Sequence, residues 1–378
     1  MTVFANGNVV TAHEVFRGTV SVESGVIGQV ERYGTAEDAS FVDLDGDYLL
    51  PGIVELHTDV LERHAIPRPG AEWPRVAAVV GYDSQLIGAG ITTVLDSLAI
   101  GYLFDTAQRP RNPRPLVEAI RAAQAADLLR ADHYLHMRCE VSTELVVDDF
   151  TPFADDPLVR LVSLMDHSPG QRQYVSVETY RQFNQARYGL SDTQVDELVR
   201  TRIEARGRYA ERHREAITAL CRKHGLPMAS HDDALVTHVE DAVRAGASIA
   251  EFPTTLEAAR TARDYGLAVL AGAPNLVRGG SHSGNISVAQ LAAHRLLDIL
   301  SSDYVPVSAL HGAFILHLHH GMSLADAVAT ISLTPARRVG LDDRGEIAVG
   351  KRADLVRVRL AGDLPLVRGV WRQGARVA

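Results

Sequence analysis

Several short apolar runs in this chain end at a side chain that can bind a metal ion. One run, residues 50–56, leads into His57-Thr58-Asp59, and another, residues 134–139, ends at Glu140. Further runs end in the same way, at Asp166-His167, His231, Glu251 and Asp303. Imidazoles and carboxylates are common ligands of divalent cations. Because the active sites of parallel β/α barrels lie at the carboxyl ends of the strands, this repetition predicts such a barrel with a metal-dependent active site.

A helical stretch, a glycine and a short apolar strand recur along the middle of the chain. The glycines of this pattern are Gly90, Gly225, Gly246 and Gly266. Glycine supplies the left-handed turn that ends a helix, and alternating helices and strands indicate a parallel sheet. The predicted strand ends fall near residues 57, 96, 140, 167, 231, 251, 273 and 303. Together they predict an α/β fold, a (β/α)₈ TIM-like barrel of the metal-dependent hydrolase type.

Short strands with turn signals occupy both ends of the chain. Residues 1–50 contain Asn6-Gly7, a dipeptide typical of hairpins, and the segment from Gly345 onward shows similar alternation. Neither end is long enough to fold alone. We therefore predict that residues 1–50 and 337–378 form one small β-sandwich domain, with the catalytic barrel of residues 51–336 inserted between them.

Composition limits the partners of the chain. Its net charge is −9, so no overall field attracts nucleic acid or an anionic membrane, and an anionic small molecule would need local cations. Cys139 and Cys221 form no CxxC pair, which argues against a disulfide framework or a zinc ribbon. No apolar segment reaches about 18 residues, and no secretory leader is evident. We expect a cytoplasmic protein that acts on a small molecule, and an assembly of identical copies remains open.

Strand periodicity places several of these polar side chains on shared faces. In the strand that ends at Glu140, His136, Arg138 and Glu140 lie on one face, and Cys139 lies on the other as a core residue. In the first strand His57 and Asp59 share a face, which is the spacing of an HxH metal pair with aspartate in place of the second histidine. After a later strand, His231 shares its face with Asp233.

Two motifs carry a resemblance to a known superfamily. The run Pro51-Gly-Ile-Val-Glu-Leu-His-Thr-Asp59 resembles the first-strand signature PGxxDxHxH of the amidohydrolase superfamily. The run Gly350-Lys-Arg-Ala-Asp-Leu-Val356 resembles its closing GxxADLV strand. The resemblance implies a metal-dependent hydrolase barrel.

Longer runs resemble a narrower family, the ribosyl-triphosphate diphosphatases of the bacterial carbon–phosphorus lyase pathway. These runs lie at residues 57–59, 67–69, 161–173, 229–233, 250–255, 272–285 and 300–304. The resemblance covers essentially the whole chain. It implies hydrolysis of a ribosyl 5-triphosphate to the 5-phosphate and pyrophosphate in phosphonate catabolism. It also implies one or two divalent metal ions, zinc foremost, with manganese, iron or magnesium as alternatives.

The strand ends and the resemblance together give a candidate ligand set. The predicted metal ligands are His57, Asp59, Glu140, His167, His231 and Glu251, and the predicted general base is Asp303. Alternatives stay open at three positions. Glu140 could pair with an arginine such as Arg138, Glu251 could cap a loop, and only one of Asp166 and His167 can face the barrel interior.

The predicted phosphate contacts lie in a glycine-rich run and at two isolated arginines. The run at residues 278–285 provides Arg278, Ser281 and His282, and such loops can present backbone N–H groups to phosphate oxygens. Arg172 and Arg68 are further candidates, each with a surface salt bridge as the alternative.

Two other functions compete with hydrolysis of a triphosphate. The first is hydrolysis of an amide or cyclic C–N bond in a small phosphorylated or anionic substrate, because fold alone does not separate these chemistries. The second is a scaffold protein that has lost its activity. The arginines and the glycine-rich run favour a polyanionic substrate. The ionisable residues at the strand ends argue against the scaffold, because buried ionisable groups are costly without partners.

Overall fold

The computed structural model describes residues 1–34, 41–101, 112–281 and 284–378. The chain divides into two compact units. The first unit contains residues 1–96, 116–134 and 272–378, and the second contains residues 97–115 and 135–271.

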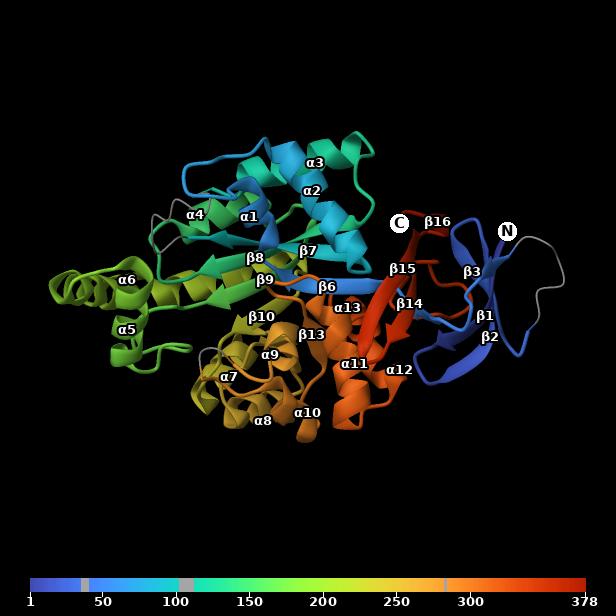
Figure 1. Ribbon diagram of the computed structural model, residues 1–378. Helices are drawn as coiled ribbons and strands as arrows, with labels where there is room; N and C mark the ends of the chain where they lie inside the picture. The colour runs from blue at the N-terminus through green and yellow to red at the C-terminus, as the bar shows by residue number, and fades with distance from the viewer. Residues whose placement is uncertain (35–40, 102–111, 282–283) are drawn as a thin grey trace. The chain divides into compact units, whose positions relative to one another are not determined.

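One sheet of the first unit joins the two ends of the chain (Figure 1). Its strands are β1 (Thr2–Val10), β2 (Val15–Glu23), β3 (Val26–Arg32), β4 (Val42–Asp43), β5 (Tyr48–Pro51), β14 (Leu355–Ala361), β15 (Leu364–Arg372) and β16 (Ala375–Arg376). They follow the order β16-β15-β14-β5-β1-β2-β3, and β4 pairs with β1. The pairing of β14 with β5 places Leu355 opposite Pro51. Phe4 and Trp371, from opposite ends of the sequence, pack edge to face at 4.9 Å in its core. The small β domain built from both ends is confirmed, while its exact boundaries stay a prediction.

Asn6-Gly7 does not form the predicted hairpin turn. The dipeptide lies inside β1, where the register with β2 shifts between Phe4 and Gly7 and Asn6 has a φ of 60°. A Cβ atom on Gly7 would lie 2.5 Å from the side chain of Leu44. The glycine is therefore needed for close packing within a β-bulge.

The catalytic part of the chain contains a parallel sheet. Its strands are β6 (Ile53–Thr58), β7 (Ile91–Ile100), β8 (Asp132–Glu140), β9 (Val159–Met165), β10 (Met228–His231), β11 (Ile249–Glu251), β12 (Ala268–Gly272) and β13 (Ile299–Ser301). They follow one another in sequence order from β6 to β13. Thr58 and Asp303 form a parallel bridge after β6 and β13, where the Asp303 N–H donates to the His57 carbonyl at 3.1 Å. This bridge brings the first and last strands together, and the predicted eight-stranded barrel is confirmed.

Helices follow most of these strands, as the glycine pattern predicted. They are α1 (Val60–Ala65), α2 (Arg75–Gly88), α3 (Arg114–Ala125), α4 (Val146–Phe150), α5 (Val177–Tyr188), α6 (Asp192–His224), α7 (Val236–Ala245), α8 (Leu256–Asp264), α9 (Ala273–Val277), α10 (Val288–Ala293), α11 (Ser308–His320), α12 (Leu324–Ala329) and α13 (Leu333–Arg338), with a 3₁₀ turn at Thr151–Phe153. Gly225 and Gly246 end α6 and α7 with φ values of 66° and 88°. One strand differs from expectation, because β7 continues past Asp96 to Ile100 through buried residues. The part of the chain that the structure describes contains no helix with the length and hydropathy of a transmembrane span.

Candidate active site

The end of β6 carries the first pair of predicted ligands. His57 and Asp59 are 2% and 9% exposed. Asp59 is the residue that precedes α1, so the strand-to-helix turn fixes its position. The Arg63 guanidinium, one helical turn later, lies 3.8 Å from Oδ1 of Asp59. Both predicted ligands thus lie at the carboxyl end of a barrel strand, as the sequence analysis predicted.

Glu55 connects the ends of β6 and β13 within the first unit. Its Oε1 accepts hydrogen bonds from the His57 N–H at 2.7 Å and the Ser301 hydroxyl at 2.8 Å. Its Oε2 accepts from the Ser302 N–H at 2.6 Å. Burial raises the pKa of the Glu55 carboxyl. The half-buried Asp303 follows directly, with a left-handed φ of 52°. Glu55 therefore fixes the backbone that carries both His57 and the predicted base.

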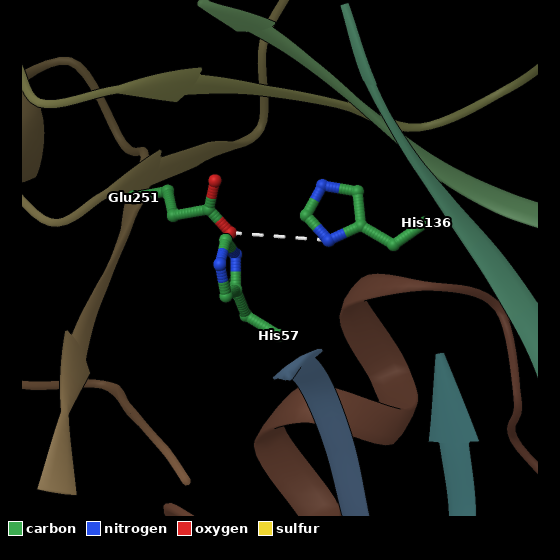
Figure 2. Close-up of side chains that lie close together, drawn as sticks. All are labelled: His57, His136 and Glu251. Atoms are coloured by element: carbon green, nitrogen blue, oxygen red, sulfur yellow. Dashed lines mark ion pairs between the residues drawn. The ribbon is translucent and has the colours of Figure 1, made fainter. Parts of the chain in front are cut away.

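In the second unit, Glu251 holds two histidines from different strands. Nδ1 of His231 lies 2.7 Å from Oε2 of Glu251, and Nδ1 of His136 lies 4.0 Å from Oε1 (Figure 2). Ser163 links them, because its hydroxyl lies 2.9 Å from Oε2 of Glu251 and 2.5 Å from Nε2 of His136. Burial lowers the pKa of His231, which favours the neutral ring that binds metals. Figure 2 also labels His57, which belongs to the first unit.

A second carboxylate, Glu140, orients His167 in the same unit. Oε2 of Glu140 lies 2.6 Å from Nδ1 of His167, and its Oε1 accepts from the Ser142 hydroxyl at 2.7 Å. Nε2 of His167 lies 3.6 Å from Oδ2 of Asp232. Burial alone would lower the pKa of His167, but the charges of Glu140 and Asp232 outweigh it and raise the pKa to about 9. Glu140 is paired with His167 here, so it does not form the alternative ion pair with Arg138.

His167, His231 and Asp232 form a donor group suited to a divalent cation. Their ligand atoms lie within 4.8 Å of one another. Nε2 of His231 lies 3.4 Å from the same Asp232 carboxylate that His167 faces. In both histidines a carboxylate contacts Nδ1, which leaves Nε2 directed toward the group. Carboxylates commonly orient metal-binding histidines in this way, so the residues present fit a zinc-type ion.

Three members of these networks, His136, Ser163 and Asp232, are not in the predicted ligand set. His136 shares a strand face with Glu140, and that parity could have identified it. Ser163 carries no chemical signal in the sequence. Asp232 follows the strand end with a left-handed φ of 57°, so strand parity does not apply to it. Asp233 binds the Arg172 guanidinium.

The structure also separates the two residues at the end of β9. His167 faces Glu140 and Asp232, whereas Asp166 forms an ion pair with Arg206 of α6 at 2.9 Å. Of these two residues, His167 is the one that contacts the donor group, and its role as a ligand stays a prediction.

The predicted phosphate contacts lie in different surroundings. Arg172 is 5% exposed and also donates to the His231 carbonyl at 3.1 Å. Arg278 and Arg68 are exposed, the former at the end of α9. The Ser281 hydroxyl accepts from the Asn285 N–H at 3.2 Å. His282 lies outside the described residues.

Comparisons with known proteins agree with this architecture. A model of the amidohydrolase family matches residues 88–378. The α-D-ribose 1-methylphosphonate 5-triphosphate diphosphatase of Escherichia coli (strain K12) is 43% identical over 98% of this chain and 99% of its own length. A dihydroorotase of Methanopyrus kandleri is 40% identical over only 17% of this chain and 19% of its own length.

Solved structures share the fold at low sequence identity. The N-acetylglucosamine-6-phosphate deacetylase of Pasteurella multocida has a TM-score of 0.67 at 14% identity, and the match covers 100% of this chain and 99% of the deacetylase. A D-hydantoinase has a TM-score of 0.59 at 14% identity, with 100% and 95% covered. At this identity the likeness concerns the fold alone.

Proposed function

Since the chain belongs to the amidohydrolase family, we propose that it is a metal-dependent hydrolase that converts α-D-ribose 1-methylphosphonate 5-triphosphate to the 5-phosphate and pyrophosphate. The observation that carries this proposal is the 43% identity to the Escherichia coli diphosphatase over nearly the full length of both chains. The donor group in the second unit supports it independently, because it gives the chain the means to hold a divalent cation. The reaction would form part of phosphonate catabolism through the carbon–phosphorus lyase pathway.

We propose that His167, His231 and Asp232 hold the ion, which is zinc in the first instance. His57, Asp59, Glu140 and Glu251 remain proposed ligands from the strand-end pattern. Glu140 and Glu251 can serve in two ways, because a carboxylate can orient an imidazole with one oxygen and bind a cation with the other. A bound divalent ion would neutralise negative charge on phosphate oxygens and make water more acidic.

Asp303 is the proposed general base. It follows β13 at the barrel's carboxyl end, and its backbone is fixed by the hydrogen bonds to His57 and Ser301. A carboxylate at this position would accept the proton of the attacking water and orient it toward the α-phosphorus. Pyrophosphate would then leave as one unit, and arginines would stabilise its charge without protonation by an acid.

The phosphate chain needs cationic or N–H contacts beyond the base. We propose that Arg278, Ser281 and His282 provide them, because an arginine fork and backbone donors match phosphate oxygens. Arg68, exposed near α1, would be an additional contact. The guanidinium of Arg172 is paired with Asp233, so a phosphate contact from Arg172 would have to share or replace that ion pair.

We further propose that the protein is located in the cytoplasm and meets its substrate there. Both cysteines are free and buried, which fits a reducing compartment. Hydrolysis of a C–N bond, the alternative left by the sequence, gains no support from the deacetylase and hydantoinase structures, because those likenesses extend to the fold alone.

Phosphorus NMR of the products tests the proposed function. The purified protein, stripped of metal and then reloaded with zinc or manganese, is incubated with the ribosyl triphosphate. The proposal predicts equal amounts of pyrophosphate and the 5-phosphate, and only in the metal-loaded samples. Stepwise release of inorganic phosphate, or no turnover with any divalent ion, would contradict it.

A further inference from the structure

Arg138 is a buried arginine that the proposed mechanism does not use. It lies near the carboxyl end of β8, on the same strand face as His136 and Glu140. Its side chain is among the buried charged groups, and the residue is 9% exposed. His136 contacts Ser163, and Glu140 contacts His167. Arg138 therefore occupies the strand position between two residues of the networks that orient the donor group.

One donor of the Arg138 guanidinium is unsatisfied among the described residues. Its Nε is buried without a hydrogen-bond partner in the part of the chain that the structure describes. No ion pair among these residues includes it, although Glu140, the partner that the sequence left open, is two positions away. Two other arginines of the second unit are neutralised, Arg172 by Asp233 and Arg206 by Asp166. A buried cation with an unsatisfied donor is costly, so this arrangement favours an anionic partner that the described residues do not supply.

The charge of Arg138 acts on the proposed metal ligands. Burial is the main cause that lowers the pKa of His231, and Arg138 lowers it further. Burial would raise the pKa of Asp232, but His231, His167 and Arg138 together outweigh this and lower it. Arg138 is therefore electrostatically coupled to the donor group. Because Glu140, two residues along the same face of β8, contacts His167 of the donor group, an anion bound to the guanidinium would lie beside that group.

We propose that Arg138 binds phosphate oxygens of the substrate next to the donor group of His167, His231 and Asp232, and so selects polyphosphate esters. The identity of the ester rests on the proposed function. The planar fork of arginine matches a phosphate group with two parallel hydrogen bonds, whereas lysine offers only a point charge. Arg138 would thus provide a strong phosphate contact near the carboxyl end of β8.

Calorimetry with inorganic tripolyphosphate tests this inference without turnover. The zinc-loaded wild-type protein, Arg138→Met and Arg138→Lys are titrated, and elemental analysis afterwards confirms that zinc is retained. The matched control is Arg200→Met, which removes the same charge from an exposed arginine paired with Glu197 and Glu204 on α6. Arg138→Met should weaken tripolyphosphate binding by about ten- to a hundred-fold, as expected for a lost charge-assisted hydrogen bond. The tripolyphosphate affinity of Arg138→Lys should lie between those of Arg138→Met and the wild type. The affinity of Arg200→Met should equal that of the wild type.

The outcomes separate this inference from the proposed function. Unchanged affinity in Arg138→Met would overturn it, as would failure of the zinc-loaded wild type to bind tripolyphosphate. If Arg138→Met does not fold or loses zinc, the tripolyphosphate affinity of Arg138→Lys becomes the deciding measurement. A wild-type affinity in Arg138→Lys would overturn the specific role of the arginine fork. Tripolyphosphate binding that depends on Arg138, without hydrolysis of the ribosyl triphosphate, would refute the proposed substrate and leave this site standing.

Discussion

Nδ1 of His231 lies 2.7 Å from Oε2 of Glu251, while Nε2 of the same ring lies 3.4 Å from Asp232. One ring nitrogen is thus held by a carboxylate on the neighbouring strand, and the other is directed to the donor group. The strands β10 and β11 pair in parallel with His231 opposite Glu251, so the sheet register itself sets this contact.

Glu251→Gln should weaken metal binding without unfolding the protein. Glutamine keeps the shape of the side chain but loses the charge that orients and polarises His231, and changes of this kind typically cost about 10- to 100-fold in metal affinity. Metal content after dialysis against a competing chelator measures the effect. Glu257→Gln, an exposed acid on α8, is the matched control. Equal zinc retention in Glu251→Gln and the control would show that this contact does not support the metal.

Arg278→Ala should reduce use of the triphosphate and leave the metal content intact. Loss of one charge-assisted hydrogen bond costs about 1.5–3 kcal/mol, or roughly one to two decades in kcat/KM. Steady-state kinetics on the ribosyl triphosphate measures the loss. Arg244→Ala, at an exposed arginine on α7, should behave as the wild type. Unchanged kinetics in Arg278→Ala would remove the end of α9 from the substrate site.

Stability should fall at alkaline pH because of a buried histidine in the first unit. Nδ1 of His133 lies 2.9 Å from Asp96, and Nε2 lies 3.4 Å from Asp83. Burial alone would lower the pKa of His133, but these two carboxylates outweigh it and raise the pKa from 6.5 to about 9. A raised pKa stabilises the fold fully below pH 6.5, and this stabilisation is lost as the pH rises through 9.

The unfolding free energy should therefore decrease by roughly 3 kcal/mol between pH 6.5 and pH 9.5 from this group. Urea unfolding across that range measures the loss, and an NMR titration identifies the group, with the His133→Gln spectrum as the assignment control. A His133 ring that titrates near or below 6.5 would contradict the prediction.

Asp303→Asn should remove most of the turnover and little of the binding. The amide keeps the shape of the side chain but cannot accept the proton from water, so kcat should fall by roughly two to four decades. Zinc content and KM should stay close to the wild-type values. Kinetics with metal analysis on the same preparation provides the measurement. A kcat within threefold of the wild type would exclude Asp303 as the base.

The pattern of apolar and polar residues over short stretches of sequence was enough to predict the barrel. It also predicted many of the polar residues at which the barrel strands end. Glu140, His231 and Glu251 end β8, β10 and β11 in the structure, because short apolar runs and the chemistry of their last residues are properties of neighbouring positions. Gly225 and Gly246 end their helices for the same local reason.

Contacts between distant residues could not be predicted in this way. The pairing of Arg172 with Asp233 joins positions 61 residues apart, and Ser163 bridges His136 and Glu251 through the sheet register. The left-handed backbone at Asp232 interrupts the strand parity just after His231. These features depend on tertiary structure, which periodicity does not encode.

Hydrolysis in ¹⁸O-water tests the central claim most directly, because the position of the label reports which phosphorus is attacked. The zinc-loaded protein is incubated with α-D-ribose 1-methylphosphonate 5-triphosphate in labelled water, and both products are analysed by mass spectrometry and phosphorus NMR. Attack at the α-phosphorus predicts the label in the ribose 5-phosphate product and unlabelled pyrophosphate. Label in pyrophosphate would place the attack at the β-phosphorus and contradict the account.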